Sequence, residues 1–191
     1  GYSVSYIPVD STGNLDLEIL KSSLRADTAL VSLMLANNET GVILALHEIG
    51  EFLRDRNVLF HIDAVQAAGK SLINVRSLGA DYLSLSAHKF YGPKGVGALY
   101  VRHDVAFTPL IVGGNQERGR RGGTENVAGI VGMGEASRLA ALDLDQETKK
   151  LSAFRDDFER FVHDEIEGCR IHGKTASRLC NTSSLGFCGI E

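Results

Sequence analysis

One lysine of the chain, Lys89, stands where its side chain could act as a nucleophile. It directly follows His88 at the end of an apolar strand-like run, and a turn rich in glycine and proline comes next. A lysine that is partly desolvated and beside a second potentially cationic group favours its neutral amine form. That amine attacks carbonyl carbons and forms Schiff bases. Most lysines are solvated surface residues instead, so the rest of the sequence must decide between these two interpretations.

Three apolar runs end in polar side chains, and the last of these runs is the one before Lys89. Ligands of open α/β sheets gather at the carboxyl ends of the strands. We therefore expect the polar groups to meet at one rim of a sheet, as an active site would require. The first run is followed by the Asn38 amide, and the second by the Asp63 carboxylate and the Gln66 amide. The third is followed by the Ser86 hydroxyl, the His88 imidazole and the Lys89 amine.

Several of these side chains also have an ordinary structural interpretation. Asp63 could cap a short helix over residues 64–68, or it could be a buried carboxylate that needs a cation such as a protonated pyridine nitrogen. Asn38 could stabilise a turn before Gly41, or it could donate to a phenolate or a carboxylate. Gln66 could lie on a solvated helix face. The residues alone leave both sets of roles open.

A metal site and a nucleotide phosphate loop are weaker alternatives. His61 and Asp63 share one face of a predicted strand and could ligate a metal, but no third ligand has suitable spacing. We therefore expect no metal. The run Gly69-Lys70-Ser71 lacks the preceding glycine of a phosphate-binding loop, which argues against a nucleoside triphosphatase.

A glycine-rich loop over residues 113–124 contains three arginines. The loop enters a predicted helix at about Thr124 or Glu125, where backbone amides and the Thr124 hydroxyl favour phosphate binding. The arginines could add charge-assisted contacts. A nucleic-acid site is not expected in this loop, because it is short and the whole chain is acidic.

The hydrophobic pattern alternates between strand and helix periods over most of the chain. This succession predicts an α/β fold with a mostly parallel sheet flanked by helices. The predicted strands cover residues 4–9, 29–35, 58–62, 82–86 and 96–101, and the predicted helices cover 15–24, 46–56 and 64–68.

The pattern changes after about residue 125. Two long helices are predicted over 130–142 and 148–167, separated by the acidic Asp143-Leu144-Asp145, and short strands over 170–172 and 183–187. We therefore expect residues 1–135 to be part of a large domain. Residues 136–191 would then be linking helices and the start of a small α+β domain.

The composition is that of an ordinary globular chain, with 191 residues, 43% of them hydrophobic and 23% charged. The net charge of −4 gives no basic field for nucleic acid or anionic lipid, and no apolar run approaches the roughly 18 residues that span a bilayer. Three cysteines without metal-ligand spacing suit a reducing compartment, so we expect a cytoplasmic protein, or a mitochondrial one in a eukaryote. Both ends fall inside apolar patterns, which suggests a fragment of a longer chain.

Four ordered motifs carry a family resemblance that extends over nearly the whole chain. They are Ala36–Gly41 (ANNETG), His61–Gln66 (HIDAVQ), Ser86–Gly95 (SAHKFYGPKG) and Arg120–Asn126 (RRGGTEN). Together they resemble the cysteine desulfurases of the NifS/IscS type, including the related selenocysteine lyases. These are pyridoxal 5'-phosphate enzymes of fold type I in the aminotransferase class V superfamily. The run RLCNT at the end resembles the family's RLPNT segment, with Cys180 where proline is usual.

The resemblance implies a role for each candidate residue. Lys89 would bind the cofactor as a Schiff base and then move the substrate α-proton, with His88 beside it. Asp63 would pair with the pyridinium nitrogen, Val65 would lie against one ring face, and Gln66 would bond the phenolic oxygen. Ser86 and His88 would bind the phosphate, and Thr124 would bind the phosphate of the neighbouring subunit. Asn38 would help to hold the cofactor or the substrate carboxylate.

The implied reaction converts L-cysteine to L-alanine and an enzyme persulfide, which would serve iron–sulfur cluster or thiolation pathways. The resemblance also implies a homodimer with shared active sites, and a sulfur-acceptor or scaffold protein as a partner. The resemblance places the sulfur-accepting cysteine beyond the end of this chain, and Cys169, Cys180 and Cys188 would be structural. The chain alone would be inactive. A selenocysteine lyase and a non-catalytic scaffold of the same fold are the alternatives.

Overall fold

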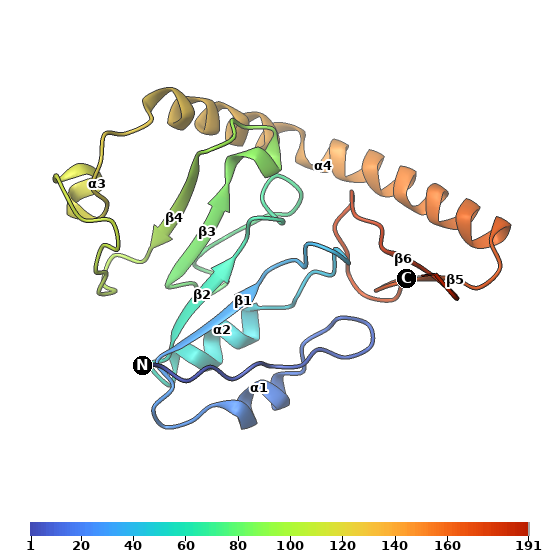
Figure 1. Cartoon of the computed structure of the whole chain (residues 1–191), viewed down its shortest axis with the longest axis horizontal. Coiled ribbons are helices and arrows are strands. Elements are labelled where there is room, and N and C mark those ends of the chain that lie inside the picture. Colours follow the sequence, from blue (N-terminus) through green and yellow to red (C-terminus); the bar gives the residue numbers. More distant parts are fainter. Residues whose placement is uncertain (191) are drawn as a thin grey trace.

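A four-stranded sheet forms the centre of the molecule in the computed structural model, which describes residues 1–190 (Figure 1). Its strands β1 (Leu30–Met34), β2 (Leu59–Asp63), β3 (Tyr82–Ser86) and β4 (Gly97–Val101) lie side by side in chain order. The first three strands are parallel, and β4 runs antiparallel to β3. The predicted α/β class with a mostly parallel sheet is confirmed.

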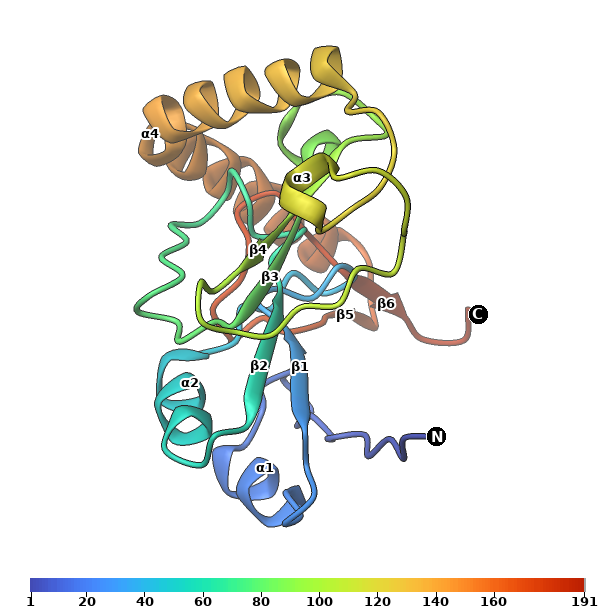
Figure 2. The same ribbon diagram turned by 90° about the vertical axis from the view of Figure 1, so that its left-hand side faces the viewer.

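Two helices, α1 (Leu17–Ser23) and α2 (His47–Arg54), lie on the same side of this sheet (Figure 2). The core between the helices and the sheet is apolar and closely packed, with Leu20, Leu53, Phe60, Ile62 and Leu83 all at 1% exposure or less. Burial of such side chains is the main stabilising term of a domain of this size. It holds the strands, and therefore their carboxyl ends, in a fixed register.

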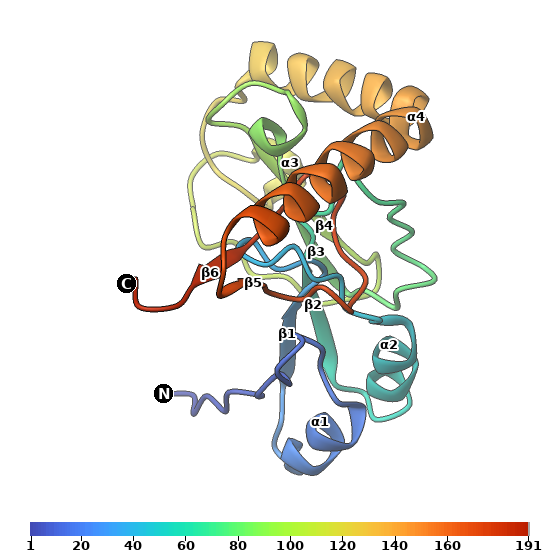
Figure 3. The same cartoon turned by 90° about the vertical axis from the view of Figure 1, so that its right-hand side faces the viewer.

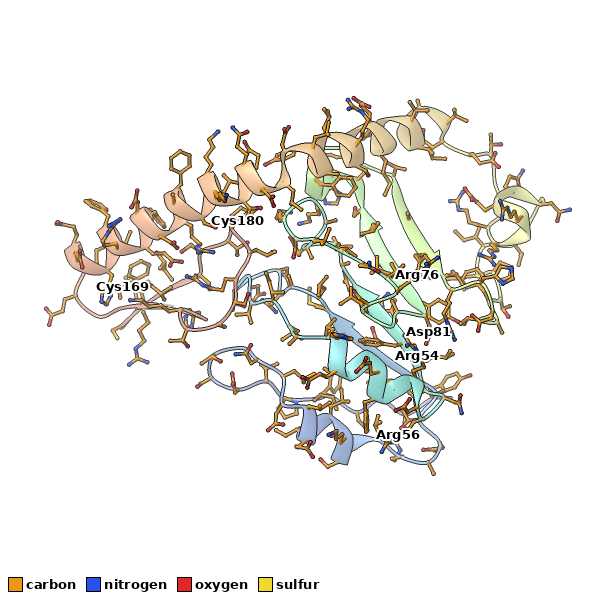
Figure 4. The ribbon with its side chains drawn as sticks, turned by 180° about the vertical axis from the view of Figure 1, so that it is seen from behind. Arg54, Arg56, Arg76, Asp81, Cys169 and Cys180 are labelled. Atoms are coloured by element: carbon orange, nitrogen blue, oxygen red, sulfur yellow. The ribbon has the colours of Figure 1, made fainter. Side chains whose placement is uncertain are left out.

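The amino ends of β2 and β3 are joined by a buried carboxylate at the opposite end of the sheet from Lys89. Asp81 accepts a hydrogen bond of 2.7 Å from the backbone N–H of Phe60 and lies 2.7 Å from Nε of Arg102. Figure 4 shows Asp81 with Arg54 at this end. A buried carboxylate that is both hydrogen-bonded and ion-paired is satisfied, so these groups have a structural role.

One continuous helix, α4 (Val127–Glu165), replaces the two helices predicted near the end of the chain. The prediction of two linking helices is wrong, because Asp143-Leu144-Asp145 contains neither glycine nor proline. An aspartate inside a helix costs only about 0.7 kcal/mol relative to alanine, and the neighbouring alanine, leucine and lysine residues favour the helix. The expected division at residue 135 therefore falls inside α4.

The segment after α4 turns back beneath that helix (Figure 3). It forms the antiparallel pair β5 (Cys169–Ile171) and β6 (Leu185–Phe187), close to the predicted short strands. Between them the chain joins the loop after β1, since the N–H of Ile43 donates to Ser177 and the N–H of Leu179 donates to Gly41.

Two other predicted elements are absent within the described residues. Residues 4–9 form no strand, and only Val9 makes a single bridge, to Leu15. Residues 64–68 form hydrogen-bonded turns instead of a helix. A short helix, α3 (Gln116–Gly119), lies in the loop between β4 and α4, with Glu117 and Arg118 in left-handed conformation. Among residues 1–190 no helix has the length and apolar character to cross a membrane.

Candidate active site

The carboxyl ends of β1, β2 and β3 form one rim, and they point toward α4 (Figure 1). Met34, Asp63 and Ser84 are register partners across the three strands. The backbone continues this pairing past the strand ends, because the N–H of Leu35 donates to the carbonyl of Asp63 over 2.8 Å and the N–H of Ala64 donates to the carbonyl of Ser84 over 3.1 Å. The polar residues that follow these strands are thus brought to one rim.

Lys89 lies in a single 3₁₀ turn, η1 (Ala87–Phe90), directly after β3. Both ends of this turn are buried, Ala87 fully and Phe90 at 4% exposure, and they pack with Ala68 and with Ala136 of α4. The Lys89 side chain itself is half-buried. Lys89 is therefore held at the rim by a rigid and buried backbone, which a catalytic group requires.

The turn closes at Tyr91, which adopts the left-handed conformation with φ of 67°. Its neighbour Gly92 approaches the backbone so closely that a Cβ there would lie 2.9 Å from the Cβ of Ala87. Left-handed backbone at a residue other than glycine is uncommon and is found more often at functional sites than elsewhere. After this sharp turn the chain enters β4, whose first residue, Gly97, pairs with Ser86.

Ser86 and His88 flank the start of η1 and contact each other. The Ser86 hydroxyl and Nδ1 of His88 are 2.9 Å apart. His88 is exposed and Ser86 is half-buried. A hydroxyl and an imidazole in this arrangement offer two adjacent polar groups that can donate to an anion such as a phosphate.

Asp63 makes a hydrogen bond within the turn after β2, where no helix forms for it to cap. Its Oδ1 accepts the N–H of Val65 over 3.0 Å. Within residues 1–190 no donor is found for Oδ2, although the side chain is half-buried. A carboxylate with one free oxygen at this rim fits a cationic partner such as a protonated pyridine nitrogen, so the hydrogen bond within the turn is compatible with a cation-binding role.

Asn38 is presented by a tight turn after β1. The side chain of its neighbour Asn37 accepts hydrogen bonds from the N–H groups of Glu39 and Thr40, each over 2.9 Å. Gly41 then adopts φ of 75°, and the chain folds back to pair Ala36 with Ile43. Asn38 is left exposed, so its amide is available to a ligand.

His61 bridges the three parallel strands on the same face as Asp63. Its Nδ1 lies 2.7 Å from the hydroxyl of Ser32 and its Nε2 lies 2.8 Å from the hydroxyl of Ser84. Burial lowers the pKa of His61, against the opposing effect of the nearby Asp63. The His61 imidazole is therefore neutral at neutral pH, so it does not compete as a cation with a ligand for the Asp63 carboxylate.

Lys70 is a residue of this site that the sequence did not identify. Its ammonium group donates to the backbone carbonyl of Lys89 over 2.7 Å and to that of Gln66 over 3.2 Å. The spacing of four residues between Gln66 and Lys70 was the only available signal, and the contact with Lys89 depends on tertiary structure. Val65 and Gln66 themselves are half-buried in the turn after β2.

Thr124 is exposed in the loop that precedes α4, whereas η1 packs against Ala136, more than two turns into that helix. The expected helix start at Thr124 or Glu125 is wrong, because α4 begins at Val127 and is capped by Asn126, whose side chain accepts the N–H of Gly129. Asn126 takes the capping position because its side chain reaches the first turn of the helix.

Other features of the described residues bear on the chemistry. Residues 1–190 contain no group of three or more His, Cys, Asp or Glu side chains placed to hold a metal ion. All three cysteines are free thiols. Cys169 and Cys180 are buried, which suits a structural role, while Cys188 is exposed.

Comparisons with known proteins place this rim in context. The chain matches the aminotransferase class-V family over residues 1–191. A cysteine desulfurase from a Nostoc species is 48% identical over 191 residues, which are 100% of this chain and 48% of that protein. A cysteine desulfurase IscS from Dictyoglomus turgidum is also 48% identical with the same coverage.

Solved structures give the same result at the level of the fold. A NifS-like protein superposes with a TM-score of 0.94 and 42% identity, covering 100% of this chain and 52% of that one. A structure described as SspA in complex with cysteine superposes with a TM-score of 0.83 and 32% identity. The match covers 98% of this chain and 52% of the SspA chain. The chain thus spans about half the length of the relatives that it matches.

Proposed function

The chain belongs to the aminotransferase class-V family, and we propose that the protein containing it is a pyridoxal 5'-phosphate-dependent cysteine desulfurase. Its reaction would be the removal of sulfur from L-cysteine to give L-alanine and an enzyme persulfide. The observation that supports this most directly is the rim itself, where the strand that ends in Asp63 pairs with the strand that leads to the half-buried Lys89, and Asp63 has one free oxygen. The identity of 48% to desulfurases over the whole chain supports the same conclusion.

The residues at the rim fit the chemical groups of that cofactor. Lys89 Nζ would bind its aldehyde carbon, and Asp63 Oδ2 would accept a hydrogen bond from its ring nitrogen. Val65 would contact one ring face, and the Gln66 amide would donate to the phenolic oxygen. The bound cofactor supplies an electron sink for the charge that develops on the substrate α-carbon.

The adjacent Ser86 and His88 would donate to the phosphate group. Their mutual contact of 2.9 Å places two polar groups directly before Lys89. Asn38, exposed on its turn, would donate to the substrate carboxylate or to the cofactor. Because Asn38 and Lys89 follow different strands, the two could approach a bound amino acid from separate sides.

Proton movement would depend on Lys89. Once its amine is released by the substrate, Nζ can take the proton from the substrate α-carbon. The rigid η1 turn keeps the amine at the rim for this step, which favours transfer through a short and fixed distance. His88 would remain next to Lys89 and hold the phosphate.

The position of Thr124 supports a proposal about assembly. Thr124 is exposed in the loop before α4, and there it would be accessible to the phosphate bound by the neighbouring subunit of a homodimer. The sulfur would leave through an acceptor or scaffold protein. Three free thiols support a reducing compartment such as the cytoplasm, or the mitochondrial matrix in a eukaryote.

The proposal is tested with the intact protein that contains this chain. With L-cysteine and a thiol reductant, we expect alanine and sulfide in equal amounts, and no product from residues 1–191 alone. A protein that binds pyridoxal 5'-phosphate but releases alanine only from L-selenocysteine would be a lyase instead. Failure to form alanine from either amino acid would contradict the proposed function.

A further inference from the structure

The Lys70 side chain joins the two segments that follow β2 and β3. Its ammonium group donates to the carbonyl of Lys89 at 2.7 Å and to the carbonyl of Gln66 at 3.2 Å. One of these carbonyls belongs to η1 and the other to the turn after β2. Hydrogen bonds that involve a charged donor are about twice as strong as neutral ones. The contact therefore restrains the backbone of Lys89 against the segment that holds Gln66.

The backbone beside Lys70 is shaped for this close approach. Gly69 has φ of 74°, and a Cβ at this position would lie only 2.6 Å from the Cβ of Phe90. The turn after β2 thus packs directly on η1, one residue away from Lys89. Only glycine allows this conformation and this contact together, so Lys70 is placed where its side chain meets the Lys89 carbonyl.

The Lys70 ammonium group carries a charge without a carboxylate partner. The Lys70 side chain is half-buried, and none of the ion pairs within residues 1–190 includes it. Burial lowers the pKa of Lys70, Cys180 opposes this effect, and the positive charge of Lys89 adds to it. Lys89 from η1 and Cys180 from the C-terminal segment are the titratable groups that act on it, and Figure 4 shows Cys180 beside the turn after β2.

We infer that Lys70 is a positioning residue for Lys89, because its ammonium group holds the Lys89 carbonyl against the turn that contains Gln66. This inference rests on the proposed function, because it assigns Lys70 a role toward the same site. A purely structural lysine would affect the stability of the fold alone. A positioning residue would also change how readily the Lys89 amine reacts, because the contact fixes the backbone that carries this amine.

The test uses the intact protein with three substitutions, Lys70→Met, Lys70→Arg and, as a control, Lys149→Met on the exposed surface of α4. The kcat and KM for alanine formation from L-cysteine are measured for each. Loss of the contact with the Lys89 carbonyl loosens the backbone that carries the amine, so we expect Lys70→Met to lower kcat about tenfold with little change in KM. Lys70→Arg should retain most of the original kcat, and Lys149→Met should not change it.

A second measurement does not depend on catalysis. Apo-protein is mixed with pyridoxal 5'-phosphate, and the fraction trapped on Lys89 by borohydride is followed with time. We expect Lys70→Met to slow trapping roughly tenfold, the equivalent of one hydrogen bond to a charged group. Unchanged kcat and trapping rate in a folded Lys70→Met protein would overturn the inference, whereas a wild-type protein without any cofactor band would overturn the proposed function instead.

Discussion

Replacement of Asp63 by asparagine is expected to lower the rate of alanine formation from L-cysteine by about a hundredfold to a thousandfold, as for other lost electrostatic contacts in active sites. Asparagine has almost the same shape as aspartate, and its side-chain oxygen can still accept the Val65 N–H that Asp63 Oδ1 accepts at 3.0 Å. What is lost is the negative charge that would keep the ring nitrogen of the cofactor protonated. The electron sink then weakens while the turn stays intact.

The design separates this effect from a loss of folding. Because the hydrogen bond to the Val65 N–H is retained, the urea midpoint of Asp63→Asn should stay close to that of the wild type. Asp143→Asn on the exposed surface of α4 removes the same charge far from the rim and should leave the rate unchanged. A fully active Asp63→Asn enzyme would show that the free oxygen of Asp63 has no cofactor role.

Replacement of Glu159 by glutamine is expected to destabilise the fold by about 3–5 kcal/mol, because it leaves the Arg178 guanidinium buried without its anion. The two side chains form a bidentate pair at 2.6 and 2.8 Å, and they are 5% and 6% exposed. The pair joins α4 to the segment that contacts the loop after β1. Urea unfolding of the intact protein measures the loss, and Glu165→Gln, which lies exposed near the end of the same helix, is the control.

The pH dependence of this contribution follows from the pKa of Glu159. Burial alone would raise it, but hydrogen bonds and charge from Arg178 hold it below the ordinary value of 4.5. A carboxyl group with a lower pKa in the folded state stabilises the fold above about pH 4.5 and loses that contribution as the pH falls. The wild type should therefore lose more stability than Glu159→Gln between pH 5 and about pH 3. Equal acid sensitivity would contradict a stabilising ion pair.

The strand ends were predictable because the signal is local. Mostly apolar runs of four or five residues that stop at Asp63 or Ser86 predict buried strands, and parallel pairing then brings their ends together. The structure has β1 to β3 in that arrangement. The expected strand over residues 4–9 failed because alternation alone does not provide a partner strand, and the only pairing found there is the bridge between Val9 and Leu15.

Features that depend on distant residues could not be predicted. The continuity of α4 depends on many weak propensities that outweigh one acidic tripeptide, and the start of this helix is set by the Asn126 side chain. The contact between Lys70 and the Lys89 carbonyl joins residues 19 positions apart. Likewise, the bridging of Ser32 and Ser84 by His61 requires the strand register, which the sequence pattern does not contain.

The central claim, that Lys89 is the lysine that binds the cofactor, is tested most directly by chemical trapping. The intact protein is incubated with pyridoxal 5'-phosphate, reduced with borohydride, digested, and analysed by mass spectrometry. We expect the phosphopyridoxyl group on the peptide that contains Lys89, and its absence together with loss of the visible absorption band in Lys89→Ala. Attachment mainly at Lys70, Lys94 or another lysine, or a wild-type protein that takes up no cofactor, would contradict the account.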